Sequence, residues 1–313
     1  QIICQAGSPM HWFGAKRQEA FVALHMRCNY QPCRKAHPFL PNKKVPIFNV
    51  AMGCPTKRQN QTTRIEKLAF ETDDGLGAAA RLGVIVLQTD QTIEHEFARL
   101  LTAKDVALYH ARIPNAMKVS PDTLGQMKAD LPATAKLLPP SFSFDTIGYA
   151  CTSGATMIGE DKVAGIIQEL HPQAKISNPL SACKAGLAAL GVRQLALVTP
   201  YPPEVTLAMR DNLKRAGFDA TIVASFNQSD DFTVARISQQ SVLDAILKAG
   251  KTDLCDGVFV SCTSLRTLDI LSHAESVLGK PVVSSNQALA WHMMRLSGIN
   301  HQPDGFGRLF TLG

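Results

Sequence analysis

Two cysteines in this chain each close an apolar run and are each followed by threonine and serine. The first motif is Cys151-Thr152-Ser153 within YACTSGA, and the second is Cys262-Thr263-Ser264 within VSCTSLR. Backbone N–H groups at a helix start bind anions and favour a thiolate, and the hydroxyl groups can donate to a carboxylate. Two facing thiols would suit removal and delivery of a proton on opposite sides of one carbon.

Each cysteine also has a plain structural interpretation, because free cysteine is among the most buried residue types. The repetition of Cys-Thr-Ser favours a functional role for Cys151 and Cys262. Neither Cys183 nor Cys255 is followed by two hydroxyl residues, so we assign both to structural roles. The motifs also lack the Cys-x-x-Cys spacing of a disulfide switch.

The elements that position these cysteines alternate along the chain. Apolar runs typical of buried parallel strands occupy 82–90, 105–113, 144–153, 194–201, 219–226, 256–264 and 280–287. Helical stretches lie between them at 91–101, 121–138, 157–170, 203–216, 232–249 and 265–278. This alternation predicts an α/β fold with parallel sheets.

A shift of 111 residues superimposes one part of this pattern on another, because 262 minus 151 is 111. The same shift places the run 84–89 on 195–200 and the helix start 119–127 on 230–238. We therefore expect two pseudo-symmetric Rossmann/flavodoxin-like halves. The first comprises 82–186 plus 281–313 and the second comprises 187–280. Ligands of such sheets bind beyond the carboxyl ends of the strands, which predicts an active site in the cleft between the halves.

The shift also pairs Asp90 with Tyr201, each at the end of an equivalent strand. Asp90 could bind an ammonium group or a thiol, and Tyr201 could donate to a carboxylate. The alternatives are a helix cap for Asp90 and a rim aromatic for Tyr201. Thr89, Ser285 and Asn286 also stand at strand ends and are weaker candidates.

The net charge of +6 is confined to the first 80 residues, which carry 11 Lys+Arg and 5 Asp+Glu. The remainder has no net charge, and so lacks the excess of basic residues that nucleic-acid binding needs. The leader 1–80 has no steady hydrophobic period. We interpret it as disordered or as lying upstream of the natural start, with Met52 a plausible initiator. Cys28, Cys33 and His37 have no partner pair for a zinc site.

No apolar run reaches the length of a membrane-spanning helix, and no secretion signal is recognisable. These features predict a cytoplasmic protein with no membrane partner. Neither a P-loop nor a dinucleotide-binding glycine motif is present, and the histidines form no metal constellation. We expect neither a cofactor nor a metal.

The segments GVIVLQTDQTIEHEF, LVTPYPPEV, SCTSLRTLD and GKPVVSSNQALAWHMMRLSGI resemble the aspartate/glutamate/hydantoin racemase superfamily over about 82–310. The similarity is greatest to the branch of maleate cis-trans isomerases, arylmalonate decarboxylases and ectoine-utilisation protein A. It implies a cofactor-free homodimer or higher oligomer with one catalytic cysteine from each half, Cys151 and Cys262. The decarboxylases keep only the second cysteine, which argues against decarboxylation.

Asp90 and Asp231 stand where the isomerases resembled carry asparagine, and an acid there would pair with an ammonium group. The function predicted is a racemase or epimerase acting α to the carboxylate of an amino-acid-like substrate, which the ectoine group suggests is a diaminobutyrate derivative. Thr152, Ser153, Thr263 and Ser264 would hold the carboxylate. The alternatives are a maleate-type isomerase with Cys151 as nucleophile, and a non-catalytic two-lobed binding protein.

Overall fold

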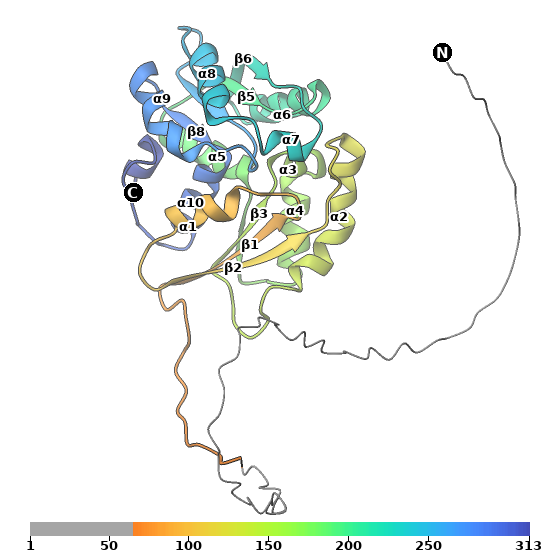
Figure 1. Ribbon diagram of the computed structural model, residues 1–313, viewed down its shortest axis with the longest axis vertical. Helices are drawn as coiled ribbons and strands as arrows, with labels where there is room; N and C mark the ends of the chain where they lie inside the picture. Colours follow the sequence, from red (N-terminus) through yellow and green to blue (C-terminus); the bar gives the residue numbers. More distant parts are fainter. Residues whose placement is uncertain (1–64) are drawn as a thin grey trace, which may run out of the picture. The chain divides into compact units, whose positions relative to one another are not determined.

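Two four-stranded parallel sheets form the centre of the fold (Figure 1) in a computed structural model that describes residues 65–313. The first sheet has the order β2-β1-β3-β4 and comprises β1 (Ala80–Leu87), β2 (Val106–Ile113), β3 (Thr146–Ala150) and β4 (Lys175–Ser177). The second has the order β6-β5-β7-β8 and comprises β5 (Gln194–Thr199), β6 (Asp219–Ser225), β7 (Gly257–Val260) and β8 (Val282–Ser284). The matching orders confirm the predicted α/β fold with two similar parallel sheets.

Helices cover the sheets and connect their strands. They are α1 (Ile93–Leu100), α2 (Pro121–Ala135), α3 (Thr152–Ile158), α4 (Glu160–Gln168), α5 (Pro179–Ala189), α6 (Pro203–Arg215), α7 (Asp231–Val234), α8 (Gln239–Gly250), α9 (Leu271–Leu278) and α10 (Ser285–Leu296), with the 3-10 helices η1 (Leu268–Ile270) and η2 (Arg308–Thr311). Every residue of β3 and β7 is buried, as expected of parallel strands covered on both faces. None of the helices in the described part of the chain is long and apolar enough to cross a membrane.

The last strand differs from expectation. β8 was expected to complete the first half, but it pairs with β7, Val260 lying opposite Ser284. The connection through α9 places β8 beside β7, and the apolar pattern of a strand does not indicate which sheet it joins. The division expected between 186 and 187 falls inside α5.

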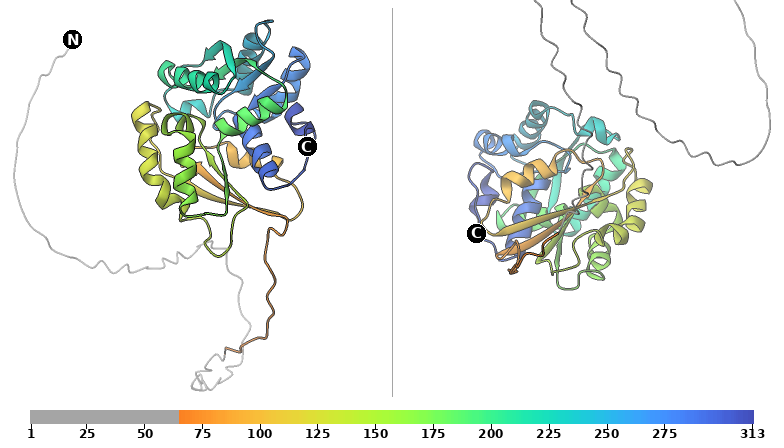
Figure 2. Two further views of the ribbon diagram at one scale, coloured as in Figure 1. Left: turned by 180° about the vertical axis from the view of Figure 1, so that it is seen from behind. Right: turned by 60° about the horizontal axis from the view of Figure 1, so that its bottom comes forward.

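The helices that follow β4 and β8 lie between the two sheets. α10 leaves the second sheet and packs against β3, α1 and α5, and α5 also contacts β8 (Figure 2). Both helices begin with a capping box, in which the side chain of Asn178 or Ser284 accepts a backbone N–H. The predictions made for Cys28, Cys33, His37 and Met52 fall outside the described residues.

Candidate active site

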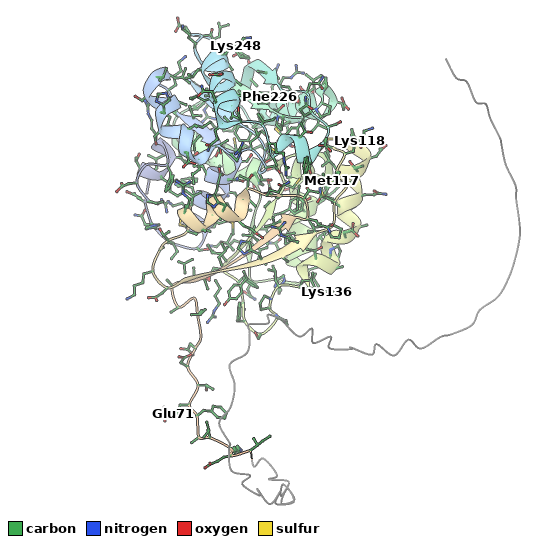
Figure 3. All side chains as sticks on the ribbon, viewed as in Figure 1. Glu71, Met117, Lys118, Lys136, Phe226 and Lys248 are labelled. Carbon is green, nitrogen blue, oxygen red and sulfur yellow. The ribbon has the colours of Figure 1, made fainter. Side chains whose placement is uncertain are left out.

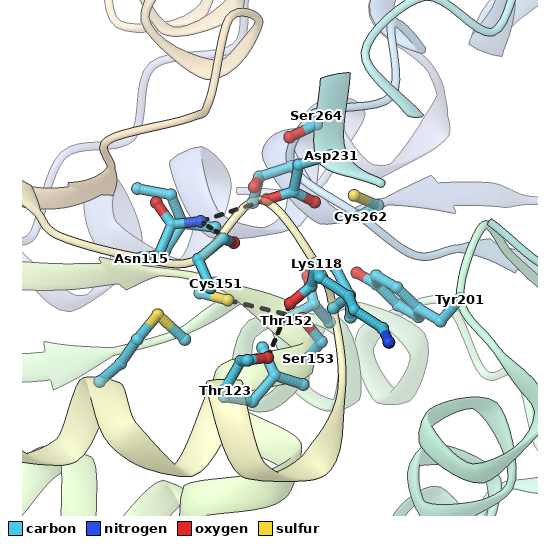
Figure 4. A pocket seen from close by; sticks show the side chains of 16 residues that line it. Asn115, Lys118, Thr123, Cys151, Thr152, Ser153, Tyr201, Asp231, Cys262 and Ser264 are labelled. Atoms are coloured by element: carbon cyan, nitrogen blue, oxygen red, sulfur yellow. Dashed lines mark hydrogen bonds between the residues drawn. The ribbon is translucent and has the colours of Figure 1, made fainter. Parts of the chain in front are cut away.

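One cavity lies at the carboxyl ends of the central strands and is lined from both halves (Figure 4). The first half supplies Leu87, Asn115, Ala116, Lys118, Val119, Thr123, Leu124, Met127, Cys151, Thr152 and Ser153, and the second supplies Tyr201, Asp231, Cys262, Thr263 and Ser264. The space open to water centres is about 20 Å³, little more than one water needs. The cavity is therefore narrow, and binding of a substrate requires its lining side chains to move.

Cys151 is the residue at which β3 gives way to α3. Its Sγ accepts the N–H of Gly154 at 3.1 Å and lies 3.6 Å from the Ser153 hydroxyl. We expected the helix start to lower the pKa of this thiol, and that expectation is wrong. Burial raises the pKa of Cys151 to about 12, against the smaller lowering effects of Ser153 and Gly154. The resting group is a neutral thiol.

Cys262 follows the end of β7 and has a φ of 136°, a value that residues other than glycine rarely adopt. Burial, and then the charge of Asp231, raise the pKa of the Cys262 thiol to about 12. The Tyr201 hydroxyl and the Ser264 N–H oppose this shift by hydrogen bonding to the thiol. Burial also raises the pKa of Tyr201 well above its ordinary value, so a neutral phenol is available as a donor beside Cys262.

Asp231 forms another part of the wall. Asp231 Oδ2 accepts from the Thr89 hydroxyl at 2.8 Å and from Asn115 Nδ2 at 3.2 Å. Burial raises the pKa of Asp231 to about 6. Sequence reasoning missed Asn115, although it lies just beyond the carboxyl end of β2, where the rule for parallel sheets would have found it.

Asp90 does not line the cavity, in contrast to the expectation that it reaches the cleft. It is buried, and its Oδ1 accepts the backbone N–H groups of Thr92 and Ile93 at the start of α1. Asp90 is not the N-cap of α1, which is Thr92, but one of its carboxyl oxygens binds the backbone at the start of that helix. Its charge still acts on the site, because it contributes to raising the pKa of both Cys151 and Cys262.

Two connections, one from each half, meet at the cavity wall. The Val119 N–H donates to Ser229 O at 2.6 Å and the Asp231 N–H donates to Met117 O at 2.9 Å. Together they form an isolated antiparallel bridge between the β2–α2 and β6–α7 connections. Met117 and Lys118 project from the first connection close to α7 (Figure 3), and the exposed Lys118 is the cation of the cavity wall.

A buried polar layer lies behind the second motif. Asn286 Nδ2 donates to the Thr263 carbonyl at 2.9 Å and to Glu96 Oε2 at 2.7 Å. Glu96 Oε1 accepts the N–H groups of Thr267 and Leu268 at 2.9 and 3.0 Å. Burial raises the pKa of Glu96 to about 7. Asn286, a weak candidate from the sequence, thus supports the motif from behind and does not line the cavity.

Comparison with known proteins gives several matches. The arylmalonate decarboxylase family model matches residues 167–310. The chain is 35% identical to an arylmalonate decarboxylase of Bordetella bronchiseptica over 127 residues, 40% of this chain and 53% of that protein, so this match spans about half of the relative. It is 26% identical to a maleate isomerase of Nocardia farcinica over 73% of this chain and 94% of the relative.

Solved structures agree. A maleate isomerase from Pseudomonas putida S16, crystallised with maleate, superposes with a TM-score of 0.68 at 23% identity, covering 75% of this chain and 98% of that one. A liganded arylmalonate decarboxylase variant superposes with a TM-score of 0.67 at 25% identity, covering 74% and 98%. This likeness establishes the two-sheet fold, and relatives named maleate isomerase support an isomerase-type enzyme. These sequence relatives and the fold agree with the resemblance to the Asp/Glu racemase superfamily, and the relatives that match are maleate isomerases and arylmalonate decarboxylases.

Proposed function

We propose that this protein is a two-thiol racemase or epimerase that moves a proton at the carbon next to the carboxylate of a small amino-acid-like substrate. The observation that carries the proposal is that Cys151 and Cys262, from different halves, line one cavity, each with a threonine and a serine beside it. In each direction one thiolate takes the α-proton and becomes a thiol. The opposed thiol gives its proton to the other face of the carbon and becomes the thiolate.

The substrate carboxylate is assigned to the hydroxyl and backbone N–H groups of the two motifs. Thr152, Ser153, Thr263 and Ser264 all line the cavity, and Tyr201 adds a neutral phenol donor. Removing an α-proton builds negative charge on the carboxylate oxygens, and donors fixed in a water-poor site stabilise that charge best.

The acidic side of the wall supports an amino-acid-like substrate. Both thiols have a pKa of about 12, so forming a thiolate needs nearby positive charge. Asp231 works against the thiolates, and an ammonium group bound beside it would offset its charge. A dicarboxylate would instead add negative charge. An amino-acid-like substrate therefore fits, and the diaminobutyrate derivative suggested by the sequence resemblance is the specific candidate.

Maleate-type cis-trans isomerisation is the second candidate, favoured by maleate isomerases that match over 94–97% of their own length. In this reaction the Cys151 thiolate forms an S–C bond to one alkene carbon, and the adjacent carbon takes a proton from Cys262. Rotation about the resulting single bond is followed by return of the proton and loss of the thiolate. The exposed Lys118 at the wall could pair with the second carboxylate.

Proton NMR in D2O separates these reactions. The protein is mixed in turn with a panel of amino acids, N-acetyl-diaminobutyrate and maleate, alongside Cys151→Ser and Cys262→Ser, with Cys255→Ser as the matched control thiol outside the cavity. Loss of an α-proton signal in wild type and Cys255→Ser, but not in the other two variants, is expected. Formation of fumarate from maleate would refute the racemase proposal and support the isomerase. Unchanged spectra, with ligand affinity equal in all four proteins, would favour a non-catalytic binding protein.

A further inference from the structure

The first residue of α10 touches both Cys-Thr-Ser motifs at once. Ser285 Oγ accepts the backbone N–H of Cys262 at 3.0 Å and lies 2.8 Å from Thr152 Oγ1. All three residues are buried, and Ser285 itself has no exposed surface. One side chain that does not line the cavity thus joins a wall residue of the first half to the backbone of a wall residue in the second.

The contact to Cys262 comes where the strand ladder has ended. The N–H of Ser261 still bonds to Val198 O at 2.8 Å, whereas the next N–H, that of Cys262, bonds to Ser285. With a φ of 136°, Cys262 occupies a strained region that persists only when its surroundings hold it. Ser285 supplies that restraint at the peptide that aims the thiol.

In the contact between Ser285 and Thr152, either hydroxyl group can be the donor. A serine hydroxyl has one hydrogen and two lone pairs, and the Cys262 N–H uses one lone pair. When Ser285 donates its hydrogen to Thr152 Oγ1, the Thr152 hydrogen is free to point into the cavity that Thr152 lines. This arrangement is the one that presents a donor to a bound carboxylate.

We propose that Ser285 is a positioning residue that couples the two halves of the site, restraining the backbone of Cys262 and turning the Thr152 hydroxyl towards the substrate carboxylate. The second role rests on the proposed function, whereas the first does not depend on any substrate.

The test compares Ser285→Ala with Ser284→Ala. Ser284 is the neighbouring cap of α10, so its loss is expected to lower Tm by about 2–4 °C and to leave kinetics unchanged. Ser285→Ala is expected to lower Tm similarly but also to lower kcat/KM about tenfold, the effect of one hydrogen bond. Alkylation of the two thiols is followed by peptide mass spectrometry in the same samples. Cys262 is expected to react about fivefold faster relative to Cys151, because its segment opens more often once its N–H anchor is lost.

A double-mutant cycle tests the link to Thr152. Thr152→Val removes that hydroxyl, and adding Ser285→Ala is then expected to raise KM no further, although the alkylation ratio still changes. Ser285→Cys keeps a weaker acceptor, so its kcat/KM and alkylation ratio are expected to lie between those of wild type and Ser285→Ala. This variant still tests the proposal if Ser285→Ala does not fold. An unchanged ratio of Cys262 to Cys151 alkylation in both Ser285 variants would overturn the proposal. If wild type turns over none of the substrates, the proposed function fails while the alkylation ratio still decides the role of Ser285.

Discussion

Replacing Gly154 with alanine tests how closely the first thiol is packed. A Cβ at this position would lie 2.6 Å from Tyr149 Oη, 2.9 Å from Cys151 Sγ and 2.9 Å from Met127 Cε. The tyrosine is fully buried on β3, so its ring cannot swing away, and only the methionine methyl can yield easily. The new methyl group must therefore push the catalytic candidate Cys151 out of its place at the helix start.

Two opposing effects determine how far Gly154→Ala changes the free energy of unfolding. Overpacking a buried site costs about 1–3 kcal/mol. Alanine in place of glycine within a helix recovers roughly 0.5–1 kcal/mol. The free energy of unfolding should thus fall by up to about 2.5 kcal/mol, with a central value of about 1 kcal/mol, which lowers Tm by a few degrees. Turnover in the NMR assay should fall at least about tenfold, because small displacements of reacting groups are costly.

The matched control is Gly165→Ala in α4, where a Cβ would meet nothing within 4 Å. It should gain roughly 0.5–1 kcal/mol and keep full activity. Adding Tyr149→Phe to Gly154→Ala removes the closest contact and should restore part of the lost Tm. A Gly154→Ala protein with wild-type Tm and activity, or no recovery with Tyr149→Phe, would show that the packing around Cys151 is not as tight as these distances require.

Three further outcomes are expected. Asp231→Asn removes a charge that raises the pKa of both thiols, so the pH at which they react with iodoacetamide should fall, and turnover of ammonium-bearing substrates should fall with it; an unchanged alkylation pH profile would contradict this. The Glu96 pKa of about 7 lies above its ordinary value of 4.5. The stability that protonated Glu96 contributes is therefore complete below pH 4.5 and is lost as the pH rises through about 7. In urea titrations the stability of wild type relative to Glu96→Gln should therefore fall by about 3 kcal/mol between pH 4.5 and 8, and a pH-independent difference would refute it. Asp269→Asn breaks an exposed ion pair with Arg99 and should cost under about 1 kcal/mol by the same titration; a larger loss would mean that the pair is more than a surface contact.

The repeated motif and the strand-end rule were sufficient to bring Cys151 and Cys262 to one cavity, because both depend only on local pattern and sheet geometry. The place of Asp231 depends on a bridge between two connections far apart in sequence, which no local pattern records. Asp90 shows the opposite case. It follows the end of β1, but its Oδ1 accepts N–H groups at the start of α1, and the side chain does not line the cavity.

Other differences have local causes. One helix was expected over 157–170, but the chain forms α3 and α4 with a break at Gly159, whose φ is 99°. A helix that begins at the cysteine itself then gives Cys151 the Gly154 N–H. The thiol pKa could not be predicted from the sequence, because a helix start and burial act in opposite directions and only the folded structure shows that burial is the larger effect.

The crossing of α10 onto the first sheet determines how the chain can be divided. α10 follows β8 of the second sheet yet packs on β3 of the first, and α5 follows β4 yet contacts β8. A fragment that ended in the turn at Gly191 would lack the helix that covers β3, and the remaining fragment would carry that helix with its apolar face exposed. Neither fragment buries its own surface, so the two should be recovered as folded protein only when they are refolded together, as a complementing pair.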